Sequence, residues 1–201
     1  MKRTGIFGGT FDPVHTGHID LAKDALEQAG LDRVVFVPAR LQPFKLDRKT
    51  ASGTDRIEML KLALEGSDGM EASPYELESE SISYTYLTMR AMSERFGDDT
   101  RLFFITGTDT FLKIEMWKNS YEMLTKYSYI IGARPGYREA ELQDCITTLK
   151  EKYGTEVLTI DNTQHDISST EIRDILRAGG TLEDLVPEQV ERYIRKHGLY
   201  T

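Results

Sequence analysis

The sequence predicts an α/β fold in which an open parallel sheet is covered by helices on both faces. Short apolar runs alternate along the chain with stretches whose apolar residues repeat at helical spacing. The apolar runs are continuous and do not alternate with polar residues, which is typical of parallel strands buried on both faces. Together these observations favour strand–helix repeats around one sheet.

Six segments have the composition of buried strands. Five of them are strong candidates, and the segment around 70–73 is a weaker one because it is short and partly polar. The five stronger strands are predicted at 4–7, 34–37, 102–106, 127–131 and 157–160.

Helical periodicity predicts helices between these strands. Ile19, Ala22, Leu26 and Ala29 recur at helical spacing, and Gly30 is placed to end that helix. Further helices are predicted around 57–64, over 84–96 and over 142–153.

Two more helices are predicted near the C-terminus from their boundary residues. Ser168 and Glu171 have the spacing of a capping box, so a helix begins there. The last helix has Pro187 in its first turn and Gly198 after its end.

Composition restricts the classes of protein to consider. With 201 residues and no linker-like segment, residues 1–201 are expected to form a single domain. The formal net charge of −8 disfavours binding to nucleic acid or to anionic lipid. A single cysteine, Cys145, excludes an internal disulfide, and no zinc-ligand spacing occurs.

The sequence also gives an expectation for the location of the protein in the cell, but not for its oligomeric state. The N-terminus has the pattern of a strand, without an apolar leader-like segment, and no run has membrane-spanning length. A cytoplasmic location without membrane contact is therefore expected. The oligomeric state is not readable from the sequence, which leaves a homo-oligomer open.

The segment from Gly5 to His18 is the most informative part of the chain. It begins as a buried strand, continues through Gly8-Gly9-Thr10, and places His15 and His18 at the mouth of a predicted helix. Glycines allow close approach of the backbone, and a helix N-terminus offers N–H groups to an anion. Either histidine alone could be a helix cap, but the combination indicates a phosphate site.

A second candidate phosphate site is the segment 166–173. The first turn of its helix offers the hydroxyls of Ser169 and Thr170, and Arg173 follows. Hydroxyls, amides and a guanidinium suit the oxygens of a polyphosphate. The alternative is a well-capped helix with a solvated arginine, and this segment alone does not decide between the two.

Other polar residues also follow predicted strands. Gly107 and Asp109 suit contact with a ribose or an adenine edge, although a turn with an Asp cap is equally common. Trp117 could stack on a flat ring, with core burial as the alternative. Arg134, after another strand, would project at the same edge of the sheet. Ligands of open parallel sheets bind beyond the carboxyl ends of the strands.

These groups indicate direct transfer between phosphates. The glycines match neither the dinucleotide fingerprint nor the P-loop. No Ser or Cys nucleophile has a recognisable base partner, and no close carboxylate pair suggests glycoside chemistry. Positioning and charge stabilisation would therefore carry the reaction, without a covalent enzyme intermediate.

The motifs resemble the nucleotidyltransferase superfamily that is marked by His-x-Gly-His. The resemblance rests on Gly8-Gly9-Thr10-Phe11-Asp12-Pro13-x-His15-x-Gly17-His18 and on Ile167-Ser168-Ser169-Thr170-x-Ile172-Arg173. Within the superfamily, the chain is similar to bacterial nicotinate-nucleotide adenylyltransferases over essentially its full length. The added matches are Ser83-Tyr84-Thr85-Tyr86, Gly107-Thr108-Asp109, Trp117, 133–137 and 193–200.

This resemblance implies a Rossmann-like sheet of the nucleotidyltransferase type and a step of NAD biosynthesis. AMP would pass from ATP to nicotinate mononucleotide by in-line attack on the α-phosphate, giving nicotinate adenine dinucleotide and pyrophosphate. Mg²⁺ would be carried by the ATP phosphates, with no protein metal site, because no carboxylate cage is visible.

The resemblance also implies a role for each matching residue. The catalytic residues would be His18, Lys45 and Arg173. ATP would be bound by Gly8, Gly9, Thr10, Phe11, His15, His18, Gly107, Asp109, Ile167, Ser168, Ser169, Thr170 and Arg173. Nicotinate mononucleotide would be bound by Thr10, Tyr84, Thr85, Trp117 and Arg134.

One segment departs from the family pattern. In the long non-periodic stretch 38–54, Gln42 and Phe44 replace the usual proline and histidine of the family's loop, so Lys45 would act there alone. Three alternatives stay open. Phosphopantetheine adenylyltransferases normally have Thr in place of His15 and lack the region of Trp117, and a cytidylyltransferase is less favoured still. A silent nucleotide-binding sensor is disfavoured because His18 and Arg173 are intact.

Overall fold

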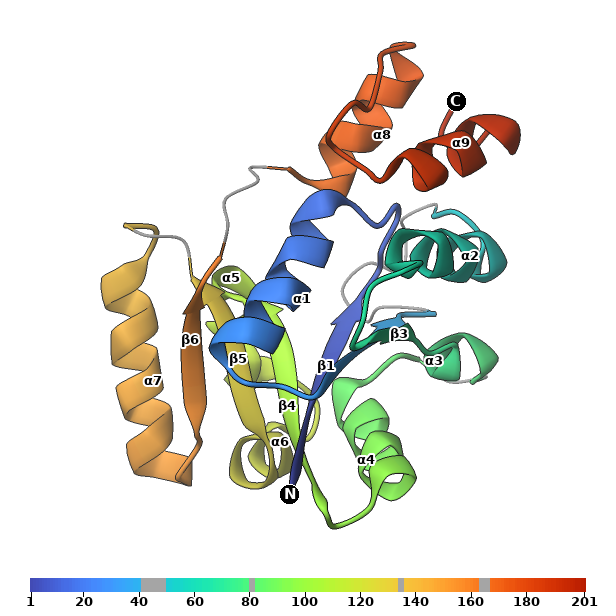
Figure 1. Cartoon of the computed structure of the whole chain (residues 1–201). Coiled ribbons are helices and arrows are strands. Elements are labelled where there is room, and N and C mark those ends of the chain that lie inside the picture. The colour runs from blue at the N-terminus through green and yellow to red at the C-terminus, as the bar shows by residue number, and fades with distance from the viewer. Residues whose placement is uncertain (41–49, 80–81, 134–135, 163–166) are drawn as a thin grey trace.

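The computed structural model describes residues 1–40, 50–79, 82–133, 136–162 and 167–201. Within them, six strands form one parallel sheet in the order β3-β2-β1-β4-β5-β6 (Figure 1). The strands are β1 Lys2–Gly9, β2 Arg33–Pro38, β3 Met70–Ala72, β4 Thr100–Gly107, β5 Ser128–Ala133 and β6 Val157–Asp161. All six predicted strands are confirmed, including the weaker one at 70–73.

The strand order places a ligand-binding crevice beside β1. The chain adds β2 and β3 on one side of β1 and then returns to add β4, β5 and β6 on the other side. In open parallel sheets, ligands bind outside the carboxyl ends of the strands at the point where the order reverses. The glycines that end β1 and β4, Gly9 and Gly107, both lie at this point.

Helices cover both faces of the sheet, as predicted (Figure 1). One apolar core joins β1 and β4 to α1 Thr16–Gln28, α2 Gly53–Leu64, α8 Ser169–Arg177 and α9 Glu188–Lys196. The core of the opposite face contains side chains from α4 Thr85–Phe96, α6 Ser120–Lys126 and α7 Glu139–Tyr153.

The boundaries of the long helices follow the local sequence signals. α1 ends at Gln28 with Ala29 as its C-cap, and Gly30 then adopts a φ of +59°, which suits glycine. α8 begins with the capping box of Ser168 and Glu171. Pro187 lies immediately before α9, one residue earlier than predicted. Four short helical elements were not predicted: α3 Tyr75–Glu78, α5 Thr108–Phe111, the 3-10 turn Ile114–Met116 and α6.

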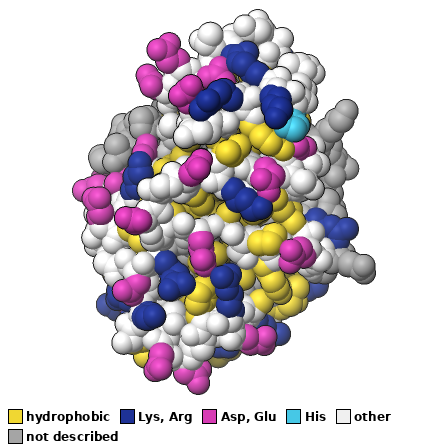
Figure 2. Space-filling view, turned by 45° about the vertical axis from the view of Figure 1, so that its right-hand side comes forward, with side chains coloured by type: hydrophobic (Ala, Val, Ile, Leu, Met, Phe, Trp, Pro, Cys, Tyr) yellow, Lys and Arg dark blue, Asp and Glu magenta, His cyan; other side chains and the backbone are white. Residues whose placement is uncertain are grey.

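Charged side chains of both signs are interspersed over the face that Figure 2 shows, between short stretches of apolar surface. On this face, the basic side chains do not gather into a single patch. Among the described residues, no helix is both long and apolar enough to cross a membrane.

Candidate active site

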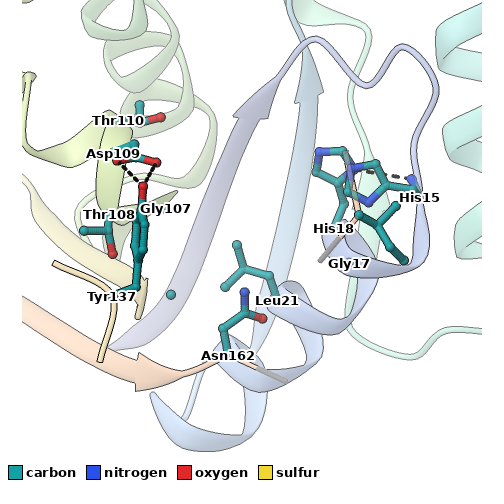
Figure 3. Close-up of a pocket in the computed structure, with 12 residues that line it drawn as sticks. His15, Gly17, His18, Leu21, Gly107, Thr108, Asp109, Thr110, Tyr137 and Asn162 are labelled. Carbon is teal, nitrogen blue, oxygen red and sulfur yellow. Dashed lines mark hydrogen bonds between the residues drawn. The ribbon is translucent and has the colours of Figure 1, made fainter. Parts of the chain in front are cut away.

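A cavity of about 260 Å³ opens at the carboxyl edge of the sheet, between the start of α1 and the ends of β4 and β5 (Figure 3). Its size is close to the lower end for small-molecule sites, about 300 Å³. It is lined by His15, Gly17, His18, Leu21, Gly107, Thr108, Asp109, Thr110, Gly132, Tyr137, Asn162 and Ile167. The two histidines lie at one end, and Asp109 with Tyr137 lies at the other.

The two histidines form one unit at the start of α1. His15 is the N-cap of the helix, and its backbone N–H donates to Nδ1 of His18 at 3.3 Å. The two imidazole rings lie with their centroids 3.6 Å apart and their planes tilted by 32°. Because Nδ1 of His18 accepts a hydrogen bond, the neutral ring carries its proton on Nε2. In this tautomer, Nε2 is the donor atom of the His18 ring.

Phe11 supports His18 from the core. Its ring is 1% exposed and meets the His18 ring edge-on, with centroids 5.0 Å apart. A Cβ at Gly9 would lie 2.8 Å from the Phe11 ring, and a Cβ at Gly8 would lie 3.3 Å from Phe104. The close approach that these glycines permit is thus to aromatic rings of the protein. The Phe11 side chain is therefore part of the core and not of the cavity lining.

The start of α8 is tied to the loop that precedes His15. The Ser169 hydroxyl donates to the carbonyl oxygen of Pro13 at 3.0 Å. Ser168 Oγ accepts from the backbone N–H of Glu171 at 3.2 Å, and the Ser168 N–H donates to the Glu171 carboxylate at 2.9 Å. The structure therefore brings the two predicted phosphate-binding segments together, and the capping box occupies the polar groups of Ser168.

The side chain of Arg173, on α8, contacts the same loop at Asp12. This side chain is buried, and Nη1 donates to the backbone oxygen of Asp12 at 2.6 Å. Nη1 also lies 3.8 Å from Asp12 Oδ2, and Nη2 donates to Thr170 Oγ1 at 3.2 Å. The guanidinium thus links α8 to the segment that carries the histidines.

Asp109 organises the opposite end of the cavity. Its carboxylate accepts the Tyr137 hydroxyl at 3.1 Å and Arg138 Nη1 at 2.8 Å. Hydrogen bonds to Glu141 and Asp109 raise the pKa of Arg138 above its usual value, so this cation stays charged. A Cβ at Gly107 would meet no atom within 4 Å, so the backbone there borders open space.

Two buried polar atoms of the lining lack partners within the described part of the chain. They are Thr108 Oγ1 and Asn162 Oδ1. Buried polar groups are nearly always hydrogen-bonded, so such atoms in a cavity lining are suited to a polar ligand. Thr10 Oγ1, at the end of β1, is in the same state.

The residues expected to bind the mononucleotide form a separate group. Tyr84 is the N-cap of α4 and Thr85 its first residue. Lys118 Nζ lies 4.9 Å from the centre of the Tyr84 ring, which brings the segment after Trp117 close to Tyr84. The half-buried Trp117 ring packs edge-on against Phe104, with centroids 5.6 Å apart. None of these residues lines the described cavity. Lys45 and Arg134 lie outside the described residues.

The sequence profile of the cytidylyltransferase-like family matches residues 6–175, from β1 through most of α8. The chain belongs to this family. The match includes the histidine pair and the start of α8, the two segments that the structure joins through Pro13 and Asp12.

Relatives of this cytidylyltransferase-like chain match it from end to end. A protein of Clostridium novyi is 35% identical over 200 residues, covering all of both chains. A protein of Clostridium tetani is 36% identical over 200 residues, again covering both chains completely. Both are named "Probable nicotinate-nucleotide adenylyltransferase". The chain is accordingly a nucleotidyltransferase.

The fold also matches solved structures. The nicotinic acid mononucleotide adenylyltransferase of Plasmodium falciparum, complexed with NaAD, superimposes with a TM-score of 0.79. The alignment covers 100% of this chain and 98% of the other at 21% identity. At that identity the likeness establishes the Rossmann-like fold of the nucleotidyltransferase type.

Several lining residues of this nucleotidyltransferase escaped the sequence analysis. Leu21 has the spacing of a core residue, and Gly132 lies inside a strand, where a Cβ would be 2.5 Å from Leu21. Tyr137 and Asn162 shortly follow the ends of β5 and β6. Tyr137 belongs to the matched segment 133–137 but was given no role there. The position after a strand, which singled out Gly107, would have identified Asn162.

Proposed function

We propose that this chain transfers AMP from ATP to nicotinate mononucleotide, giving nicotinate adenine dinucleotide and pyrophosphate. The observation that carries the proposal is the paired histidines at the N-terminus of α1, at the sheet's switch point and beside a cavity. A helix N-terminus attracts anions, and imidazole N–H groups add donors at the same place. The full-length relatives support the choice of substrates.

The chemistry requires positioning and charge stabilisation. An oxygen of the mononucleotide phosphate attacks the α-phosphorus of ATP in line with the bond to the β-phosphate. A new P–O bond forms, the α–β bridge breaks, and pyrophosphate leaves. The Nε2–H of His18 would donate to the α-phosphate as charge grows on its oxygens, because Nδ1 is engaged with the His15 N–H. No proton has to be removed from the attacking phosphate.

The cavity suggests how ATP would lie. The triphosphate would bind at the histidine end, beside Thr10. The start of α8 and Arg173 are brought near it by their contacts with Pro13 and Asp12. The adenosine would extend toward Gly107 and Asp109. There, the unpartnered oxygens of Thr108 and Asn162 could accept hydrogen bonds from the nucleoside.

The mononucleotide would occupy the neighbouring group of residues. We assign its ring to Tyr84, Thr85 and Trp117, since Lys118 joins the two segments at Tyr84. Arg134 is proposed for its phosphate, and Lys45 for the ATP phosphates.

We assign Mg²⁺ to the nucleotide and not to a site of the protein. Among them, no group of three or more His, Cys, Asp or Glu side chains could hold a metal ion. The donors at the start of α1 are N–H groups, which bind phosphate oxygens and not Mg²⁺. When bound through ATP oxygens, Mg²⁺ would neutralise part of the triphosphate charge.

Pyrophosphate release tests the proposal. Purified protein with Mg-ATP should release pyrophosphate when nicotinate mononucleotide is added. Nicotinamide mononucleotide and phosphopantetheine serve as competing acceptors in parallel assays. Release with phosphopantetheine alone would overturn the choice of substrate, and tight ATP binding without turnover would favour a sensor.

A further inference from the structure

A buried polar cluster lies behind the histidines and is centred on Asp12, which is 2% exposed. We call it the Asp12 cluster; it consists of Asp12, the Ala51 N–H, Arg173 and Tyr200. Oδ1 of Asp12 accepts the Tyr200 hydroxyl at 2.7 Å and the Ala51 N–H at 3.0 Å. The penultimate residue of the chain is thereby bound to the loop that leads to His15.

The other carboxylate oxygen faces Arg173. Oδ2 is buried and makes no hydrogen bond within the described part of the chain, and Nη1 of Arg173 lies 3.8 Å from it. Nη1 donates instead to the backbone oxygen of Asp12 at 2.6 Å. Opposite charges at this separation attract strongly in a buried site, and Arg–carboxylate pairs favour a bidentate geometry. The hydrogen bonds that Oδ1 accepts from Tyr200 and Ala51 therefore favour one orientation of the carboxylate, and attraction to Arg173 favours another.

We propose that Tyr200 is a positioning residue for ATP binding: its hydroxyl holds the Asp12 carboxylate in an orientation that prevents a bidentate pair with Arg173. The guanidinium then stays able to contact the ATP phosphates from the start of α8. This inference rests on the proposed function in taking Arg173 as a phosphate ligand.

The Tyr200 hydroxyl stays protonated and can therefore always donate its hydrogen bond to Asp12. Burial and the negative charge of Asp12 raise its pKa well above the ordinary value for tyrosine. Its proton is therefore retained across the physiological pH range. Arg56 steadies the same loop from α2, because its Nη1 donates to the carbonyls of Thr10 at 2.9 Å and Ala39 at 2.6 Å.

The variant Tyr200→Phe tests the proposal, with Tyr193→Phe as its matched control. Tyr193 is another C-terminal tyrosine whose hydroxyl donates to a carboxylate, that of Asp55, at 3.0 Å. Tyr200→Phe should raise the KM for ATP about tenfold, as for a lost hydrogen bond to a charged group, and leave the KM for nicotinate mononucleotide within about twofold. Tyr193→Phe should leave both constants within about twofold. Equal effects of both substitutions, or equal shifts in both KM values, would overturn the proposal.

A double-mutant cycle separates positioning from stability. With Asp12→Asn, no carboxylate remains to pair with Arg173, so adding Tyr200→Phe should change the KM for ATP by less than about twofold. A tenfold effect in that background would contradict the mechanism. If Tyr200→Phe does not fold, Asp12→Asn alone decides, because it should not weaken ATP binding, and a tenfold weaker affinity would overturn the proposal.

Calorimetric ATP binding keeps this inference distinct from the proposed function. Failure of the wild-type protein to release pyrophosphate with the mononucleotide would reject the function. A wild-type protein that binds ATP, and a Tyr200→Phe variant that binds it equally well, would reject only the role of Tyr200.

Discussion

Two helix N-termini meet at the carboxyl edge of the sheet, and they differ in what they offer an anion. The first turn of α1 contains no acidic residue, and two histidines in ring contact line the cavity at the start of this helix. The first turn of α8 contains Glu171, whose carboxylate accepts from the N–H and hydroxyl of Ser168. α8 thus carries its own anion at the place where a phosphate would bind.

This difference assigns separate tasks to the two helices. A carboxylate at a helix N-terminus satisfies the positive end of the dipole, which otherwise attracts a ligand. The start of α1 should therefore dominate contact with the reacting phosphate. α8 should contribute mainly through Arg173, which is anchored to Asp12.

The largest effect is expected at α1. His18→Ala should lower kcat about a hundredfold or more, with a modest change in ATP affinity, because a donor to the transition state is lost. Steady-state kinetics provide the test. His197→Ala is the control, since this ring stacks on Tyr193 after α9. An unchanged kcat for His18→Ala would remove α1 from the chemistry.

A smaller effect is expected from the cation of α8. Arg173→Lys keeps the charge but loses the planar fork, so kcat/KM for ATP should fall about tenfold. The same assay on Arg177→Lys supplies the comparison, because Arg177 lies on the same helix and pairs with the exposed Asp174 at 2.6 Å. If Arg173→Lys lowered activity as much as His18→Ala, the start of α1 would not dominate contact with the reacting phosphate.

Removing the negative charge of Glu171 tests whether this carboxylate makes the start of α8 less attractive to a phosphate than the start of α1. Glu171→Gln keeps an oxygen that can accept from Ser168 but removes the negative charge, so the KM for ATP should fall about two- to fivefold. Glu188→Gln makes the same change in the first turn of α9. A rise in KM with Glu171→Gln would show that the carboxylate assists binding.

The smallest effect on activity is expected from the cap itself. Ser168→Ala should cost about 1 kcal/mol in the free energy of unfolding, as for other lost N-caps, with the KM for ATP within about twofold. Thermal or urea unfolding measures the first quantity. A large increase in KM without loss of stability would instead make Ser168 a phosphate ligand.

The strands and long helices could be predicted because their signals are local. Short apolar runs identified five strands, and the weaker, partly polar segment at 70–73 also forms a strand. The capping box of Ser168 and Glu171 identified the start of α8. α6, with seven residues after a left-handed Asn119, is too short for helical periodicity to show. The four-residue elements α3 and α5 were missed for the same reason.

The sequence singled out two segments that the structure brings together, but it did not indicate the contacts that join them. The histidines and the segment 167–173 stand out by spacing, whereas the bond between Arg173 and Asp12 joins residues 161 positions apart. On the sequence alone, Gly9 was explained by close approach of the backbone to an anion. In the structure a side chain at Gly9 is excluded by the Phe11 ring, which occupies the space beside it. Such contacts depend on the tertiary fold.

A crystal structure with a non-hydrolysable ATP analogue tests the central claim most directly. The distances from each phosphorus to His18 and to the backbone of the first turn of α8 decide the matter. We expect the α-phosphate within hydrogen-bonding distance of His18 Nε2, at the start of α1. An analogue whose phosphates lie only against α8, with His18 making no contact, would contradict the account.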